Sequence, residues 1–196
     1  MNPSHEKILS YLEKWMIGFN WDPEHMKQTA RLSARIFDEL RILHGLGDNE
    51  RFLLLAGALV HDIGFLEDEK RHHKCSRDHI LEHRIPGMGS REHLITAMLA
   101  RYHRKAEPKK KHKRFSTLSR MDQEIVRTLA SILRVADGLD RSHTKVVTDL
   151  DCRLEDDRIF IRLHTYRDSS VELYGAEKKS GLMEKVFNRS VVFEVA

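Results

Sequence analysis

The fold of this chain is decided by the stretch Phe52-Leu53-Leu54-Leu55-Ala56-Gly57-Ala58-Leu59-Val60-His61-Asp62-Ile63-Gly64. The part from 52 to 60 carries no charged or polar side chain, which is typical of a helix that is buried on every side. A histidine and an aspartate at the end of such a helix are costly to bury unless they are paired or bind a cation. Imidazole and carboxylate are both good ligands for a divalent metal ion. We therefore expect His61 and Asp62 to bind metal, with an ion pair between Asp62 and a nearby arginine as the alternative.

Helical patterns lie on both sides of this stretch, and strand patterns follow later. Apolar residues at helical spacing and capping residues predict helices over 5–19, 23–43, 50–63, 74–83, 90–103 and 119–139. After Ser142 the pattern changes to strands over 146–154, 158–164 and 191–195, with a helix over 170–187. We expect a mainly α protein in two parts, a helical bundle over 1–143 and a small α+β appendage over 144–196.

The length and composition are those of one sizeable globular domain. The chain has 196 residues, of which 40% are hydrophobic and 33% are charged, so a stable core does not require a disulfide. The longest apolar run is far shorter than the roughly 20 residues that cross a bilayer, and Met1–His5 lack the features of a signal peptide. We expect a soluble, cytoplasmic protein with no membrane partner, in which Cys75 and Cys152 are reduced thiols.

A basic segment runs from Arg101 to Arg114. It contains eight lysines and arginines and one acidic residue, Glu107. This local excess of positive charge favours an anionic partner, and a solvated, mobile loop is the alternative. Nucleic acid is disfavoured as that partner because no aromatic residues are interleaved through the run for stacking on bases.

Other ionisable residues occur where a metal centre would use them. His25 lies in the predicted second helix, and Asp137 lies among apolar residues of the last long helix. An aspartate there needs a partner, and the alternative to a metal is an ion pair with Arg134 or Arg141, three or four positions away. The histidines of the pair His72-His73, and His103, complete the set, although each alone is more typical of a surface or capping residue.

Taken in order, these residues resemble the ligand set of the HD-domain metal-dependent phosphohydrolases. The segments 25–32, 101–105 and 133–143 are similar to the C-terminal half of the exopolyphosphatase/guanosine pentaphosphate phosphatase (Ppx/GppA) family, and the similarity covers about residue 20 to the end. That family carries an N-terminal actin-like ATPase-fold half which we do not find here, so we expect a stand-alone HD domain. Cys75 stands where relatives often have histidine, and we do not expect it to be a ligand.

The resemblance implies one metal ion bound by His25, His61, Asp62 and Asp137. It implies a second bound by His73 and His103, with Asp62 bridging the two. His72 is the alternative to His73, because adjacent histidines cannot be told apart from sequence. Oxygen and nitrogen ligands without thiolates fit Mn, Fe, Ni, Zn or Co, and the many histidines disfavour Mg alone. Whether one or two ions bind is left open.

The expected activity is hydrolysis of a phosphate ester or phosphoanhydride by hydroxide bound to metal at His61 and Asp62. Positive side chains near the site would neutralise charge on the phosphate, and the candidates are Arg104, Lys105, Lys74 and Arg141. Instead of neutralising phosphate charge, the alternative role of Arg141 is to orient the Asp137 side chain. The expected substrate is a nucleotide or a polyphosphate-like molecule. The competing function is a non-catalytic anion-binding module for polyphosphate or a guanine alarmone. The resemblance also implies a homodimer.

Overall fold

The computed structural model describes residues 2–196, and within this range the chain forms nine helices and three strands. The helices are α1 (Pro3–Ile17), α2 (Pro23–Glu39), α3 (Arg41–His44), α4 (Asp48–Val60), α5 (His72–Glu82), α6 (Ser90–Tyr102), α7 (Lys113–Ser116), α8 (Arg120–Gly138) and α9 (Ser170–Phe187). The strands are β1 (Val147–Leu154), β2 (Arg158–Thr165) and β3 (Ser190–Val195). The prediction of a mainly α protein with a small α+β part at its C-terminal end is confirmed.

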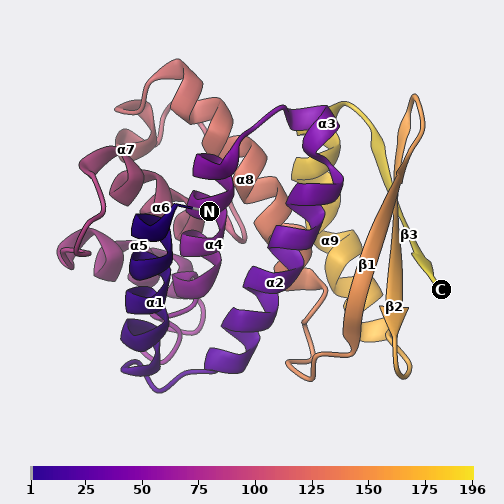
Figure 1. The fold of residues 1–196 in the computed structure, drawn as a ribbon, viewed down its shortest axis with the longest axis horizontal. Helices are drawn as coiled ribbons and strands as arrows, with labels where there is room; N and C mark the ends of the chain where they lie inside the picture. The colour runs from indigo at the N-terminus through magenta and orange to yellow at the C-terminus, as the bar shows by residue number, and fades with distance from the viewer. Residues whose placement is uncertain (1) are drawn as a thin grey trace.

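The molecule is layered, as Figure 1 shows. The helical body contains α1, α2, α4, α5, α6 and α8, and the sheet lies at the opposite side of the molecule. Helix α9 runs along α8 and also contacts β3, while β1 packs against α2. The C-terminal part is therefore attached to the body through two helices, and α9 lies close to the last helix of the body.

Helix α4 forms the centre of the body, as its uniformly apolar sequence predicts. It packs against α1, α2, α6 and α8. Phe52 and Leu54 are fully buried, and Gly57 permits a close approach to α6, because a Cβ atom there would lie 2.8 Å from Leu99. The helix ends at Val60, so that His61 and Asp62 lie in the turn that follows.

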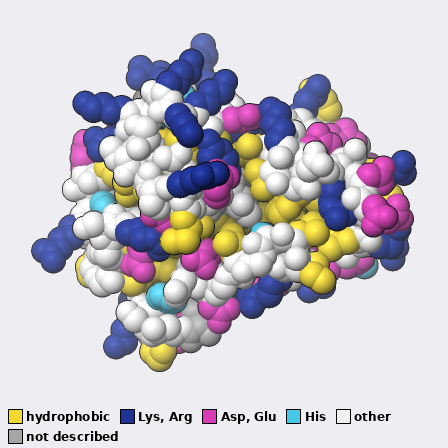
Figure 2. Space-filling model, turned by 90° about the horizontal axis from the view of Figure 1, so that it is seen from above, with side chains coloured by type: hydrophobic (Ala, Val, Ile, Leu, Met, Phe, Trp, Pro, Cys, Tyr) yellow, Lys and Arg dark blue, Asp and Glu magenta, His cyan; other side chains and the backbone are white. Residues whose placement is uncertain are grey.

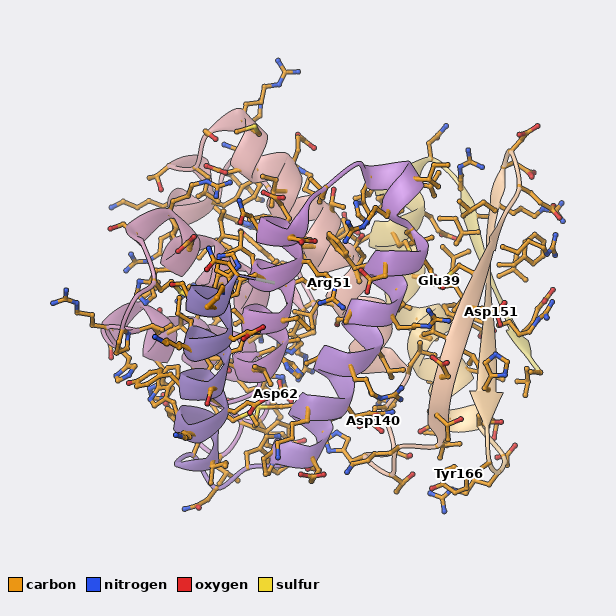
Figure 3. The ribbon with its side chains drawn as sticks, in the orientation of Figure 1. Glu39, Arg51, Asp62, Asp140, Asp151 and Tyr166 are labelled. Atoms are coloured by element: carbon orange, nitrogen blue, oxygen red, sulfur yellow. The ribbon has the colours of Figure 1, made fainter. Side chains whose placement is uncertain are left out.

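The sheet has the strand order β1-β2-β3. Strands β1 and β2 are antiparallel, whereas β2 and β3 are parallel and are connected through α9. Side chains of α2 join β1 to the body: Arg31 donates hydrogen bonds to the carbonyls of Val147 and Thr148, and the Glu39 carboxylate accepts one from the Cys152 amide at 3.0 Å. Glu39 and Asp151 are labelled on these facing elements in Figure 3.

Several element boundaries differ from the sequence-based expectation by two or three residues, and two larger differences have clear physical causes. Helix α2 ends at Glu39 instead of residue 43, because Leu40 leaves the helical conformation and the short α3 follows. The segment expected as an exposed loop, 104–118, contains the short helix α7, which is anchored by the fully buried ring of Phe115. Basic side chains project from the end of the molecule that holds α7, at the left in Figure 2.

Within residues 2–196, none of the helices combines the length and the apolar character that crossing a lipid bilayer would need.

Candidate metal centre

Six ionisable side chains from five helices and the turns after them meet at one end of the helical body. His25 lies in the first turn of α2, where the Asp22 carboxylate caps the helix by accepting from the amides of Glu24 and His25. The other five lie at or just beyond helix ends: His61, Asp62, His72, His103 and Asp137. All six are buried. Figure 3 shows Asp62, together with the nearby Asp140, toward this end of the body.

The ligand atoms fall into two groups that share one carboxylate. In the first group, the atoms of His25, His61 and Asp62 lie within 4.8 Å of one another. In the second group, the same limit holds for Asp62, His72 and His103. The Asp62 Oδ1 atom lies 3.7 Å from His61 Nε2, 3.2 Å from His72 Nε2 and 3.3 Å from His103 Nε2. Asp62 is thus at the middle of the cluster.

Each of the four histidines is held by its Nδ1 atom. His61 Nδ1 donates to the carbonyl of Ala58 and His103 Nδ1 to that of Ala100, both at 2.7 Å. His72 Nδ1 donates to the Glu69 carbonyl at 2.8 Å. His25 Nδ1 lies 2.8 Å from the Asp140 carboxylate. Metal-binding histidines usually donate their other ring N–H in this way, which fixes the ring and leaves the Nε2 lone pair for the ion.

Several of the ligand atoms lack the partners that buried polar atoms require. His25 Nε2, His61 Nε2 and Asp62 Oδ1 are buried and have no hydrogen-bond partner. The Nε2 atoms of His72 and His103 are only 3.1 Å apart. Unpaired buried polar atoms cost free energy, and a cation between them would satisfy nitrogen and oxygen donors alike. The donor set therefore fits a divalent metal ion.

The electrostatics keep most of these groups in the protonation state that metal binding needs. Burial raises the pKa of Asp62, but the imidazoles of His61, His103 and His72 lower it by more, so this carboxylate is ionised. Burial also lowers the pKa of His72 and His103, which keeps both rings neutral at pH 7.

His25 is the exception in the metal-free protein. Burial lowers its pKa, but Asp137 and Asp140 outweigh burial and raise the pKa to about 10. A cation that binds the ring must therefore displace a proton.

Asp137 is satisfied by partners other than the arginines considered from sequence. Its Oδ1 atom lies 3.5 Å from His25 Nε2, and its Oδ2 atom contacts the ammonium group of Lys179, which α9 contributes. Burial raises the pKa of Asp137, but Lys179 and His25 lower it well below its usual range. Neither Asp62 nor Asp137 forms an ion pair with an arginine in the part of the chain that the structure describes.

The structure separates the remaining sequence-predicted residues. His73 lies outside both groups, with its ring perpendicular to that of His72. Burial and the neighbouring Arg101 and Arg104 lower the pKa of His73 to about 3. Arg104 lies at the site, because its Nη1 atom is 3.1 Å from both ring nitrogens of His72. Cys75 also lies outside both groups.

The other three predicted cations form no hydrogen bond or ion pair with the clustered side chains within residues 2–196. Lys105 is exposed and donates to the carbonyl of Lys70. Lys74 lines a separate surface pocket, and the exposed Arg141 packs against Gly175 of α9. The structure thus brings together His25, His61, Asp62, His103 and Asp137 of the predicted set.

The sequence analysis assigned no role to two residues that contact the proposed metal ligands, Asp140 and Lys179. Asp140 follows Asp137 by three positions, which is a spacing that keeps two side chains on one face of a helical segment, and this signal was available. Lys179 is one of several lysines on the polar side of α9, and nothing local in the sequence distinguishes it.

A comparison with protein-family models identifies the matching family. The model described as Ppx/GppA phosphatase, domain III, matches residues 10–172. The chain belongs to this family. The part that matches the Ppx/GppA domain III model contains His25, His61, Asp62, His72, His103 and Asp137, and it ends before Lys179. The resemblance seen in the sequence is therefore confirmed. A search of curated proteins found no match.

Proposed function

We propose that this protein is a metal-dependent phosphohydrolase of the HD type that cleaves a phosphate ester or phosphoanhydride in a nucleotide or a polyphosphate-like molecule. One observation carries the proposal: four buried histidines are each fixed through Nδ1, and their Nε2 atoms are directed at ionised aspartates, three of them at the central Asp62 and that of His25 at Asp137. Membership in a phosphatase family supports the reaction class.

The proposed ligands form two adjoining sets. His25, His61, Asp62 and Asp137 would hold one ion, and Asp62, His72 and His103 would hold the second. We place His72 in the second set, in preference to His73, because only His72 directs Nε2 at Asp62. The absence of thiolates from both sets favours Mn, Fe, Ni, Zn or Co, and the histidine-rich first set disfavours Mg alone.

A divalent ion held by these residues would supply Lewis acidity, which activates water and polarises a phosphoryl oxygen at neutral pH. The chain itself supplies the remaining functions. Asp62, ionised and central, joins the two halves of the site. Buried walls around the histidines exclude bulk water and so strengthen every charge interaction within the site.

Two cations are placed to bind the phosphoryl group. Arg104 lies against His72, and the Lys179 ammonium group lies against Asp137, so they approach the cluster from different sides. Positive groups fixed in advance around a phosphate stabilise the charge that develops during its transfer. We infer that Lys179 exchanges Asp137 for a phosphoryl oxygen when substrate binds.

The test is metal analysis of the purified protein together with phosphatase assays. The substrates should include nucleotides, guanosine tetra- and pentaphosphate, cyclic nucleotides and polyphosphate. We expect His61→Ala and Asp62→Ala to lose bound metal and to reduce phosphate release by more than ~100-fold, since removal of an outer-shell partner alone commonly costs 10–100-fold. Lys179→Met should keep the metal and lose rate.

The matched control is His164→Ala. His164 also pairs with an aspartate, since its Nε2 atom lies 2.9 Å from Asp151, but this pair is half exposed on the sheet. We expect this variant to retain both metal and activity. Unchanged metal content in Asp62→Ala would contradict the proposal. Metal binding without turnover of any substrate would favour the non-catalytic anion-binding module.

A further inference from the structure

A belt of aromatic rings borders the proposed metal centre. His143 stacks on His25 with ring centroids 3.9 Å apart, and Phe65 stacks on His72 with centroids 5.0 Å apart. Trp21 joins the two pairs, because it stacks on Phe65 and meets His143 edge to face at 6.1 Å. The belt therefore runs without a break from a proposed ligand of the first ion to a proposed ligand of the second.

Trp21 and Phe65 are the two members of this belt that carry no metal-binding or charged group. Trp21 lies just before α2, and Phe65 lies in the turn after α4. Both residues are half-buried, so each reaches the surface next to ligands that are themselves buried. Since the two rings come from separate segments, they can move apart without unwinding a helix. We call the space that opens between them the aromatic slot.

The contact between Trp21 and Phe65 is a poor one for two rings of this kind. Their planes are 7° apart and their centroids 3.6 Å apart, so they lie face to face. Aromatic rings carry negative charge on both faces and prefer an offset or edge-to-face arrangement, with centroids about 4.5–7 Å apart. Trp15 and Phe19 show that arrangement, edge to face at 5.3 Å. Separating Trp21 from Phe65 therefore costs less than separating a well-arranged pair.

The closed arrangement also leaves a hydrogen-bond donor unused. Trp21 Nε1 is buried and has no hydrogen-bond partner, and an unpaired buried N–H costs free energy. No ligand can reach this atom while the two rings are in contact. Once the rings part, the N–H can donate to water or to an oxygen of the molecule that enters. The stacking and the unpaired donor thus both favour an open arrangement with a planar group in the slot.

We propose that Trp21 and Phe65 open to receive the base of a nucleoside monophosphate, which stacks between the two rings while its phosphate lies at the metal centre. The inference rests on the proposed function and narrows its substrate class. Every nucleobase has a π-face and stacks on aromatic side chains, whereas an inorganic polyphosphate has no group that would occupy the slot.

The position of the slot favours a single phosphate. Only the ring of Phe65 separates the slot from His72, a proposed ligand of the second ion. A base in the slot would therefore lie about one ring away from the ligands, and a ribose with one phosphate can bridge so short a gap. A chain of two or three phosphates would have to fold back on itself. The slot thus selects against longer nucleotides.

The first test measures binding without hydrolysis. Trp15→Phe leaves Trp21 as the single tryptophan, since the chain has two, and its fluorescence then reports the slot. The metal-loaded protein is titrated with hydrolysis-resistant phosphonate analogues of the four common nucleoside monophosphates and of ribose 5-phosphate. We expect at least one nucleoside analogue to quench the fluorescence and to bind at least about tenfold more tightly than the ribose analogue, which is within the contribution of one stacked base.

The variants Trp21→Leu and Phe65→Leu test the two walls separately, by calorimetry with the same analogues. Each should reduce the preference for the nucleoside analogue over the ribose analogue to less than about threefold. The matched control is Phe19→Leu, because Phe19 is also half-buried and also packs on a tryptophan and a histidine, Trp15 and His79, outside the belt. It should keep the full preference. The fluorescence titration leaves both walls intact, so it does not depend on how well the wall variants fold.

The outcomes separate this inference from the proposed function. Slot-dependent binding by a protein that hydrolyses no nucleotide would support base binding and contradict the hydrolase assignment. Equal affinity for nucleoside and ribose analogues, or an equal loss of preference in Phe19→Leu, would overturn the inference even if the protein is an active phosphatase. Tighter binding of inorganic triphosphate or of a single-stranded oligonucleotide than of every nucleoside analogue would also overturn it, as would the absence of binding by any analogue.

Discussion

At the scale of single residues, the proposed metal centre depends on what lies behind each histidine. His25 differs from the others because Nδ1 is held by a carboxylate, that of Asp140, where the other three use backbone carbonyls. Asp140 is fully buried and also accepts from the amide of Lys145 at 2.8 Å. The carboxylate therefore fixes both the ring and the turn after α8.

We expect Asp140→Asn to weaken metal binding by about 10–100-fold, because loss of the negative charge makes the His25 ring a poorer ligand. Competition with a chromogenic chelator measures this affinity. Asp151→Asn, in the half-exposed pair with His164, is the control and should leave metal affinity unchanged. Equal affinities for Asp140→Asn and the unaltered protein would show that Asp140 does not position a ligand.

A second residue-scale prediction concerns His44, at the end of α3. Its Nε2 atom donates to the Phe37 carbonyl at 2.9 Å, and its Nδ1 atom accepts from the Leu46 amide at 3.0 Å, so the ring must be neutral. Burial lowers the pKa of His44 below the unfolded value of 6.5. Its contribution to stability is therefore complete above that value and is lost as the pH falls toward the folded pKa.

We expect urea unfolding at several pH values to show this loss. The difference in unfolding free energy between the unaltered protein and His44→Asn should shrink by about 1 kcal/mol between pH 7.5 and pH 5, the worth of one hydrogen bond. Since the other histidines titrate in both proteins, the comparison isolates His44. A difference that is independent of pH would contradict the neutral-ring assignment.

The sequence predicts several residues of the proposed metal centre, and there are physical reasons why it misses the others. His61, Asp62 and Asp137 are detectable because each is polar where the surrounding pattern is apolar, whereas His25 and His103 have polar or basic neighbours and were assigned through the family resemblance. The choice between His72 and His73 depends on where α5 begins, since one residue turns a side chain by about 100° around a helix. Lys179 reaches the site through tertiary packing of α9 on α8, for which the sequence carries no local signal.

At the scale of elements, the contact between α8 and α9 is set by two glycines. A Cβ atom on Gly138 would lie 2.7 Å from the backbone of Gly175, and one on Gly175 would lie 2.5 Å from the Gly138 carbonyl oxygen. The two helices therefore cross with their backbones nearly touching. This crossing lies one residue beyond Asp137 and one turn before Lys179, so it sets the distance between the two charged groups.

We expect Gly138→Ala to destabilise the protein by about 1–3 kcal/mol, because the backbone of α9 must move to admit the methyl group. It should also separate Lys179 from Asp137 and lower phosphatase activity. Gly181→Ala on α9 is the matched control: a Cβ atom there meets nothing within 4 Å, and the change should stabilise the helix by up to about 1 kcal/mol. Urea unfolding of both variants tests this, and similar effects at the two glycines would contradict it.

The order and kind of elements are also largely predictable from sequence. Capping by Asp22 and Ser119 sets the starts of α2 and α8 as expected. The end of α2 and the helix α7 were missed for different reasons. The break at Leu40 has no glycine or proline to signal it, and α7 is held by the burial of Phe115, which is a tertiary contact.

At the scale of the whole molecule, the contacts across the two parts of the chain are extensive. The expected division into 1–143 and 144–196 would leave the faces of α8 and α2 that meet α9 and β1 exposed to water. Gln28 adds a buried hydrogen bond across this division, to the Val147 carbonyl at 2.7 Å. We propose that the two parts fold as one cooperative unit.

We expect a single transition in urea. Fluorescence reports the helical body, because both tryptophans, Trp15 and Trp21, lie at its N-terminal end, whereas far-UV circular dichroism reports the whole chain. Coincident midpoints would indicate two-state unfolding. A circular-dichroism change that continues after the fluorescence change is complete would instead show that the C-terminal part unfolds separately.

The contact between Lys179 and Asp137 has a consequence for the order in which the protein matures. Before α9 docks during refolding, Asp137 has no ammonium counter-charge, so a divalent cation would meet no competitor for this carboxylate. Once α9 docks, the lysine competes with that cation for the same carboxylate. We expect metal to bind faster when it is present during refolding than when it is added to the folded apoprotein. Equal rates of metal uptake would show that Lys179 does not slow metal binding.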